Sequence, residues 1–213
     1  MHSMKMVISF YLTVAAVLVY GQTVTSPPDM RPMRQIYVQD QRDRGVLLPD
    51  DGKTINSESA PAPLDYQALE KRDAERRRRT IALLRAGQLT TAQDFHDAAF
   101  IFQHGSTADD YLLAHLLAVE AIVRGDLSSK WISAATLDRY LMAIGRPQAF
   151  GTQYVGHGGN DADITQKPYD AGLIPDAMRL DFCVPPLAEQ KLNLKEFQTG
   201  KYPAGILPPG CTR

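Results

Sequence analysis

The sequence has little excess charge, little cysteine and only one long apolar segment. Its 23 basic and 24 acidic residues leave a net charge of -1, so no overall field attracts the chain to nucleic acid. Basic and aromatic residues are also not interleaved along one surface. With 44% hydrophobic and 22% charged residues, the 213-residue chain has the composition of a globular protein with one domain and appendages. We therefore expect no nucleic-acid partner.

The one long apolar segment stands at the start of the chain. Lys5 precedes an uninterrupted apolar run from Met6 to Tyr20, and small residues come before Gln22. This order, with an apolar run too short to span a bilayer comfortably, is typical of a bacterial signal peptide. Residues 1–21 are thus predicted to direct secretion or export to the periplasm. The alternative is an uncleaved membrane anchor, and no other segment could cross a membrane.

The two cysteines, Cys183 and Cys211, both lie near the end of the chain. Export to an oxidising compartment favours a disulfide between them. Closing a loop of this length stabilises the fold by on the order of 3 kcal/mol in the chain-entropy estimate. A catalytic thiol is the alternative, but neither cysteine begins a predicted helix close to a histidine.

Motifs of well-known chemistries are missing. There is no H-E-x-x-H, G-x-S-x-G, Walker or dinucleotide-binding pattern. The D-x-D-x-T run at 161–165 lacks the preceding apolar strand of aspartate phosphatases and the later Gly and Glu of a calcium loop. The five histidines include no closely spaced pair suited to zinc. We expect no metal and no cofactor.

Composition divides the rest of the chain into three parts. Residues 22–63 are rich in Pro and Ser and are predicted to be a linker, in which Arg34 to Gly45 could form a short element that docks on the main domain. Residues 64–154 are predicted to be the helical core domain. Residues 155–213 are predicted to be a loop-rich extension, with a short strand over 178–184 and a helix begun by Pro186.

Four helices are expected in the core. Each begins at a capping residue, namely Asp65, Thr91, Ser106 or Thr107, and Ser128 or Ser129, and ends at Gly87, Gly105, Gly125 or Gly145. Connections of a few residues make successive helices antiparallel neighbours. The fold class is therefore predicted to be mainly α: an antiparallel bundle with an irregular, disulfide-tied C-terminal segment.

Two polar residues of these helices defy the apolar pattern. The third helix is apolar almost all round, which predicts that it is central and that its His115 is buried. On the fourth helix Asp138 falls in the middle of the apolar stripe. A buried carboxylate needs a cation or several hydrogen-bond donors. Arg139, or one of the four arginines at 76–79, could supply the cation, although most of those four are expected on a solvated face.

The fourth helix leads into the loop GRPQAFGTQY, from Gly145 to Tyr154. The amides of Gln148 and Gln153 carry both donors and acceptors, which suits gripping a neutral polar ligand or a peptide group. They could equally clamp the loop to the helix ends. Thr152 is the loop's only hydroxyl besides Tyr154, and nothing adjacent would activate it.

The stretch FIFQHG … DDYLLAHLLAVEAIVRGD … WISAATLDRYLMAIGRPQAFGTQY resembles an uncharacterised, mainly bacterial domain-of-unknown-function family. The marks are a Gln-His pair, an Asp-Arg pair and a G-x-P-Q-x-aromatic-G-T-Q loop, here Gln103 and His104, Asp138 and Arg139, and Gly145 to Gln153. The resemblance covers about residues 64–154 and implies a helical fold without an established activity.

Two hypotheses for function follow. In the first, a cluster at the open end of the bundle is an enzyme active site or a binding site for a small polar or anionic ligand. His104 would act as acid or base, Asp138 would orient it or an arginine, and Arg139 would read an anionic group; the remaining ligand-binding candidates are Gln103, His115, Gln148, Thr152 and Gln153.

In the second hypothesis the polar cluster is structural and the domain is a peptide or protein interaction module. His115 would then bond a backbone carbonyl or Asp138, His104 would cap its helix, and Asp138 would fix helix packing. Small residues at helix crossings resemble Sel1- or tetratricopeptide-type repeats, but no period of 34 to 40 residues recurs cleanly. A groove between helices would favour this hypothesis, and a small polar pocket would favour the first.

Overall fold

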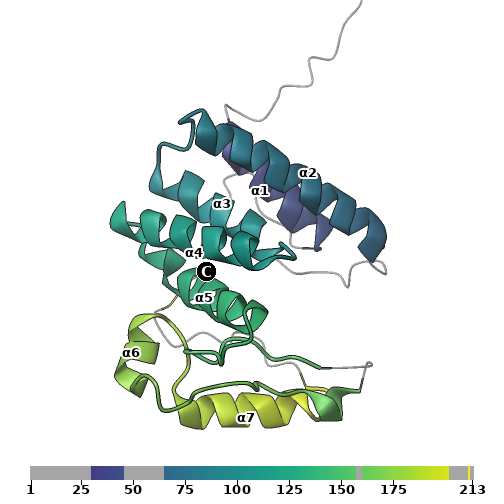
Figure 1. Ribbon diagram of the computed structural model, residues 1–213, viewed down its shortest axis with the longest axis vertical. Coiled ribbons are helices and arrows are strands. Elements are labelled where there is room, and N and C mark those ends of the chain that lie inside the picture. The colour runs from purple at the N-terminus through teal and green to yellow at the C-terminus, as the bar shows by residue number, and fades with distance from the viewer. Residues whose placement is uncertain (1–29, 46–64, 157–159, 202–210, 212–213) are drawn as a thin grey trace, which may run out of the picture.

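A computed structural model describes residues 30–45, 65–156, 160–201 and 211 of the chain. Over these ranges it contains seven α-helices and no β-strand, which confirms the predicted mainly α class (Figure 1). The predicted signal peptide and much of the predicted linker lie outside these ranges.

The four predicted core helices are present. They are α2 (Tyr66–Arg85), α3 (Ala92–Gln103), α4 (Ala108–Val123) and α5 (Lys130–Ala143), the last preceded by the short 3₁₀ helix η1 (Leu127–Ser129). The side chain of Asp65 caps α2, and Thr91 and Thr107 form capping boxes at the starts of α3 and α4. α3 packs on α4 and α4 packs on α5, as the short connections predict.

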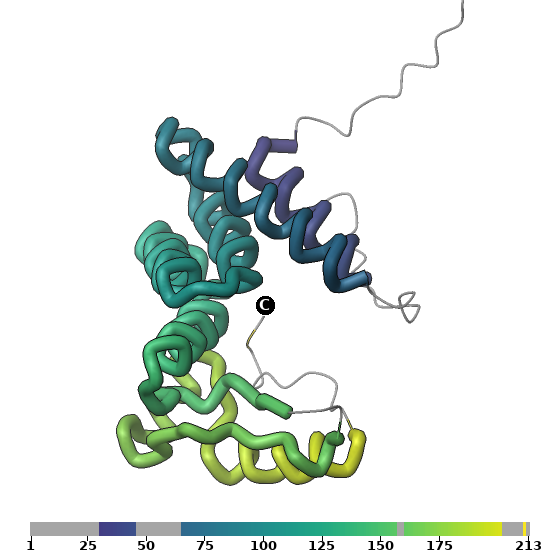
Figure 2. The backbone as a smooth tube through the Cα atoms, turned by 45° about the vertical axis from the view of Figure 1, so that its right-hand side comes forward, coloured from purple at the N-terminus to yellow at the C-terminus, as the bar shows by residue number. Residues whose placement is uncertain are grey.

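Part of the predicted linker is the helix α1 (Pro32–Asp43). Met33 and Ile36 on its inner face are at most 2% exposed and belong to the main hydrophobic cluster. α1 lies beside α2 in both views of the backbone and also contacts α3 (Figures 1 and 2). The expected docking of this segment on the core is therefore confirmed.

The prediction that the third core helix is the most buried was wrong. Ten of the twelve residues of α3 are buried, whereas α4 buries only four, all on one side. Leu116 is 55% and Val123 is 75% exposed, and His115 is only partly buried. The apolar pattern of a helix shows which of its faces could be covered, but it does not reveal which helices lie beside it. In the structure α1, α2 and α4 cover α3.

The C-terminal extension contains α6 (Asp176–Asp181), α7 (Leu187–Phe197) and the 3₁₀ helix η2 (Asp161–Asp163). The strand expected over 178–184 was wrong: Arg179 there is fully buried while Met178 and Leu180 are partly exposed, the reverse of the expected alternation. The helix begun by Pro186 is confirmed. So is the disulfide between Cys183 and Cys211.

The extension lies along α5 on the side away from α1 and α2, so the described elements follow a C-shaped course (Figure 2). Within the described ranges, no helix has both the length and the apolar character needed to span a membrane.

Candidate functional site

The Asp138 carboxylate is fully buried, as the apolar stripe predicts. Its Oδ1 atom accepts hydrogen bonds from the backbone N–H groups of Ala149 (2.7 Å) and Phe150 (3.0 Å). Its Oδ2 atom accepts from the Thr152 N–H (2.9 Å) and hydroxyl (2.8 Å). Of the two predicted ways to satisfy this carboxylate, a cation or several hydrogen-bond donors, the structure therefore shows the second, with four donors from the loop.

The two loop glutamines complete this clamp. The Gln148 amide donates to the carbonyls of Gln153 (3.0 Å) and Gln166 (2.5 Å), and its oxygen accepts from the Gln153 N–H (2.8 Å). Gln148 is fully buried, so its hydrogen-bonding groups are engaged within the protein. Gln153 donates to the Ala135 carbonyl on α5 (3.2 Å) and to the Thr152 hydroxyl (2.8 Å). These contacts match the clamping alternative for Gln148 and Gln153.

Gly151 brings this loop against the C-terminal extension. Its φ of 78° lies in the left-handed region, and an added Cβ would stand 2.4 Å from Gln190 Oε1 and 2.6 Å from Tyr169 Cζ. The Gln166 amide donates to the Gly151 carbonyl (2.6 Å), and the Gln190 amide donates to the Phe150 carbonyl (3.0 Å). The loop therefore joins the bundle to the extension.

Sequence reasoning missed the extension's share in this joint. A helical projection of α7 places Gln190, Asn193 and Phe197 on one face, and all three are buried. Polar residues on the buried face were a signal that could have been found. Nothing in the linear sequence singles out Gln166 or Tyr169, because both lie in irregular chain.

Arg179 organises the turn that carries Tyr169. Its guanidinium donates to the carbonyls of Ala171 (2.8 Å) and Ile174 (2.8 Å), to Asp176 (2.9 Å) and to the Tyr169 hydroxyl (3.0 Å). With a carboxylate and three neutral acceptors, this fully buried cation is satisfied inside the extension. Arg179 is therefore a structural residue.

Arg139 differs from Arg179 because no carboxylate pairs with it in the part of the chain that the structure describes. Its Nε atom is buried without a hydrogen-bond partner. The guanidinium hydrogen-bonds the phenol of Tyr111, whose hydroxyl in turn donates to the Gly105 carbonyl (2.8 Å). Burial lowers the pKa of Arg139, because the charged guanidinium is removed from water and has too few acceptors around it.

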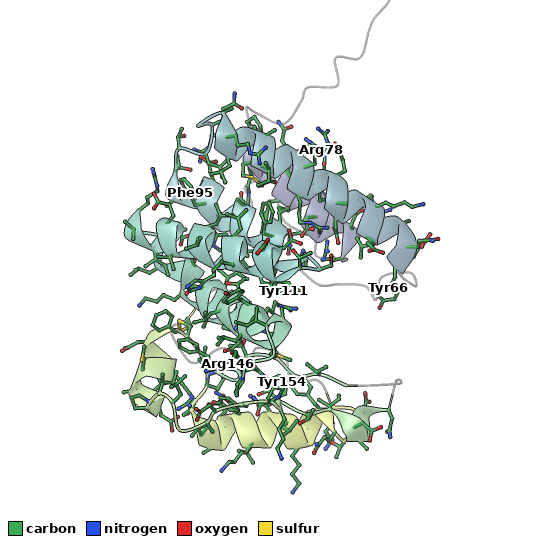
Figure 3. The ribbon with its side chains drawn as sticks, viewed as in Figure 1. Tyr66, Arg78, Phe95, Tyr111, Arg146 and Tyr154 are labelled. Carbon is green, nitrogen blue, oxygen red and sulfur yellow. A yellow bond between two sulfur atoms is a disulfide. The ribbon has the colours of Figure 1, made fainter. Side chains whose placement is uncertain are left out.

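Arg139 lines an open cavity of about 370 Å³ between α4, α5 and the loop. Tyr111, Ser106 and Gln153 supply polar groups to its wall, and Met142 and Val155 supply apolar ones. Figure 3 shows Tyr111 at the level between α4 and α5, above Tyr154 at the end of the loop. Of the predicted site residues, Arg139 and Gln153 line this cavity.

His104 lies apart from that cavity. Its Nδ1 atom is 3.3 Å from the buried Asp40 carboxylate on α1, and its backbone carbonyl accepts a hydrogen bond from Arg77 on α2 (2.9 Å). No hydrogen bond or ion pair joins it to Asp138 or Arg139 among the described residues. The expected convergence of these three residues on one point is therefore not found. Gln103, the preceding residue, is also buried.

His115 is held by a backbone carbonyl. Its Nδ1 atom lies 2.9 Å from the Ser133 carbonyl of α5. This contact matches the alternative interpretation of a histidine that fastens two packed helices.

One of the four consecutive arginines faces inward, as predicted. Arg76 is 5% exposed and pairs with Asp73 (2.8 Å) and with Asp43 of α1. Arg44 pairs with Asp40 and Asp73 in the same cluster. These ion pairs fasten α1 to α2, and the hydrogen bonds of Asp138 come from the loop and not from this run.

A second polar cluster, which the sequence reasoning did not single out, contains Ser129, His96 and Asp126. The His96 Nδ1 atom lies 2.8 Å from Ser129 Oγ and 3.2 Å from Asp126 Oδ2. Burial opposes ionisation of Asp126, but hydrogen bonds from His96 and two serines hold its pKa well below the usual range. In a Ser-His-Asp triad the serine hydroxyl and the carboxylate contact opposite ring nitrogens of the histidine. Here both contact the same nitrogen, so the cluster fastens α3 to η1.

An open groove of about 550 Å³ runs between α2 and α4. Ile81, Phe102 and Leu113 form apolar parts of its lining, and Arg85 and Asp109 are among its charged residues. Both kinds of concavity weighed from the sequence, a groove and a polar pocket, are thus present.

Within the described ranges no group of three or more His, Cys, Asp or Glu side chains could hold a metal ion. No protein-family model matches the chain, and no similar protein is found among curated proteins or solved structures. Membership of the family that the sequence resembles therefore stays a prediction.

Proposed function

We propose that the protein binds a small anionic ligand in the cavity lined by Arg139. The observation that carries the proposal is a partly buried guanidinium that lines the cavity and has no carboxylate partner in the described chain. Its Nε atom is buried without a hydrogen-bond partner. Buried charges in proteins are normally paired. An anion in the cavity would supply the missing pair.

The surroundings of Arg139 support this proposal. The neighbouring Asp138 carboxylate is directed at the loop and engaged by four donors, so its charge does not satisfy Arg139. The cavity volume lies within the range of small-molecule sites, which is about 300 to 1,000 Å³. Asp138, Gln148 and Thr152 would then be positioning residues, because they fix the loop that brings Gln153 and Val155 to the cavity.

Binding of anions by the purified protein tests the proposal. We expect a panel of phosphate, monocarboxylates and dicarboxylates to include at least one that raises the melting temperature of the wild type. Arg139→Gln should abolish that shift, and Arg146→Gln, which removes the same charge from an exposed position, should preserve it. An equal response from all three proteins would overturn the proposal.

A second candidate is peptide binding in the groove between α2 and α4. Its apolar residues and its arginines, including the exposed Arg85, suit a segment with apolar and acidic side chains. Selection from a displayed peptide library, with Arg85→Glu as counter-screen and Arg146→Glu as control, tests this candidate. Recovered peptides that bind all three proteins equally would exclude the groove.

We also propose that the protein is exported. The disulfide supports this, since oxidising compartments favour such bonds, and the basic and apolar start of the sequence is that of a signal peptide. Expression of the full chain in a bacterium, followed by fractionation and N-terminal sequencing, should recover an exported protein that starts at Gln22. Recovery of uncleaved chain from the cytoplasm alone would contradict this.

A further inference from the structure

The Arg139 cavity has further properties that restrict the class of anion, and the inference from them rests on the proposed function. Among its lining residues Arg139 is the only charged side chain. A single cation neutralises one negative charge. A phosphate dianion or a dicarboxylate would bring a second charge to a cavity whose lining supplies no second cation.

The planar guanidinium of Arg139 fits a flat anion. Tyr111 occupies part of its hydrogen-bonding capacity, and the Nε atom is buried without a partner. Arginine N–H groups lie in one plane, and a neighbouring pair of them matches the spacing of two carboxylate oxygens. The Tyr111 hydroxyl does not donate to the ligand, because its proton is directed at the Gly105 carbonyl.

The remaining wall of the cavity indicates what the anion is attached to. Met142 and Ala143 of α5 and Val155 after the loop present apolar surface, while Ser106 and Gln153 add neutral polar groups. A ligand with an apolar body would bury it against this surface, at a gain proportional to the apolar area removed from water.

From the single cation, its planar guanidinium and the apolar wall, we propose that the site binds a monocarboxylate with a short apolar body. A free short-chain acid and the C-terminal carboxylate of a peptide share this chemistry. Hexanoate represents the first source and N-acetyl-leucine represents the second.

Calorimetric titration of the oxidised full chain with hexanoate, N-acetyl-leucine, their neutral amides, succinate and phosphate tests the inference. We expect at least one of the two carboxylates to bind at least tenfold more tightly than its amide, succinate or phosphate. The tighter of the two identifies the source. Arg139→Gln should weaken that binding at least tenfold, and Arg146→Gln should leave it within twofold of the wild type.

A second variant keeps the test independent of any folding defect in Arg139→Gln. Ala143 lines the cavity and is exposed, so Ala143→Asp should fold and repel the carboxylate, with at least a tenfold loss of binding, while Ala143→Asn should bind normally.

The outcomes separate the inference from the proposed function. Tighter binding of phosphate or succinate that depends on Arg139 would overturn the monocarboxylate inference and leave the anion site standing. Binding of the amides as tightly as the acids would also overturn the inference. If no anion binds in a manner that depends on Arg139, both proposals fail.

Discussion

The Asp138 carboxylate and the Thr152 backbone N–H lie 2.9 Å apart, although fourteen positions separate them in the chain. This bond, with the three others to the same carboxylate, turns the loop after α5 back onto the helix from which it emerges. Arg139, the next residue, is left to face a cavity. One dipeptide therefore supplies both a structural anion and a cation without a carboxylate partner in the described chain.

Replacing Asp138 by Asn tests how much the fold depends on the clamp. An amide presents N–H where the loop also presents N–H, so two buried donors would oppose each other. We expect Asp138→Asn to lower the free energy of unfolding by about 2 to 4 kcal/mol, as measured by urea denaturation. The exposed Asp181→Asn is the matched control and should change it by less than about 0.5 kcal/mol. Equal stabilities for the two variants would contradict the clamp.

Two glycines near this loop separate backbone strain from close packing. Gly145 and Gly151 both have φ in the left-handed region, at 73° and 78°, but only Gly151 has atoms within 4 Å of an added Cβ. Gly145→Ala should cost about 1 kcal/mol, from the backbone conformation alone. Gly151→Ala should cost at least about 2 kcal/mol more, because Gln190 and Tyr169 must move. Thermal unfolding of the two variants would show the ordering, and a reversal would refute the packing argument.

Asp97 gives the protein a predicted dependence of stability on pH. Burial raises its pKa to about 6 against a partly opposing effect of Arg34. The folded state therefore binds more protons than the unfolded state between about pH 4 and pH 6, and this group's contribution to stability falls as the pH rises through that window. We expect the stability of Asp97→Asn relative to wild type to increase by on the order of 2 kcal/mol from pH 4 to pH 7.

Urea denaturation at the two pH values measures this difference. Asn cannot titrate, so subtracting its curve removes the effects of all other groups that the substitution leaves unchanged. A relative stability that stays constant, or that changes in the opposite direction, would show that the carboxyl group ionises normally in the fold.

The disulfide between Cys183 and Cys211 should stabilise the protein measurably. The two residues are 28 positions apart, and closing such a loop contributes about 3 kcal/mol in the chain-entropy estimate. Reduction should therefore lower the melting temperature of the wild type. The Cys183→Ser, Cys211→Ser double variant should already melt at the lower temperature and should not respond to reductant, and a response there would assign the effect to something else.

The sequence predicted the parts of the site that depend on a single helix. Asp138 lies in the centre of an apolar stripe, and its burial follows from helical geometry alone. Its partners did not follow, because a carboxylate can be satisfied by a cation or by backbone N–H groups, and only the path of the loop decides between them. His104 was misplaced for a related reason: its partner Asp40 lies on α1, within a segment interpreted as linker.

The helix boundaries were predictable because capping residues act locally. Thr91 and Thr107 each bond groups within three residues of themselves, so short-range patterns suffice. The strand predicted around Arg179 was wrong because the alternation was taken to mean that the apolar residues face inward. In the structure the chain encloses the arginine and not its apolar neighbours.

The joint around Gly151 has a consequence for how this chain can be divided. Severing the polypeptide after Tyr154 would remove Gln166 and Gln190, and with them the acceptor of a Gln148 N–H and the donors to the Phe150 and Gly151 carbonyls. The portion with helices α1 to α5 would then have an uncovered end with unsatisfied hydrogen-bonding groups. A truncated or fused version of this protein that is meant to fold should therefore keep the helices and the disulfide-tied extension together.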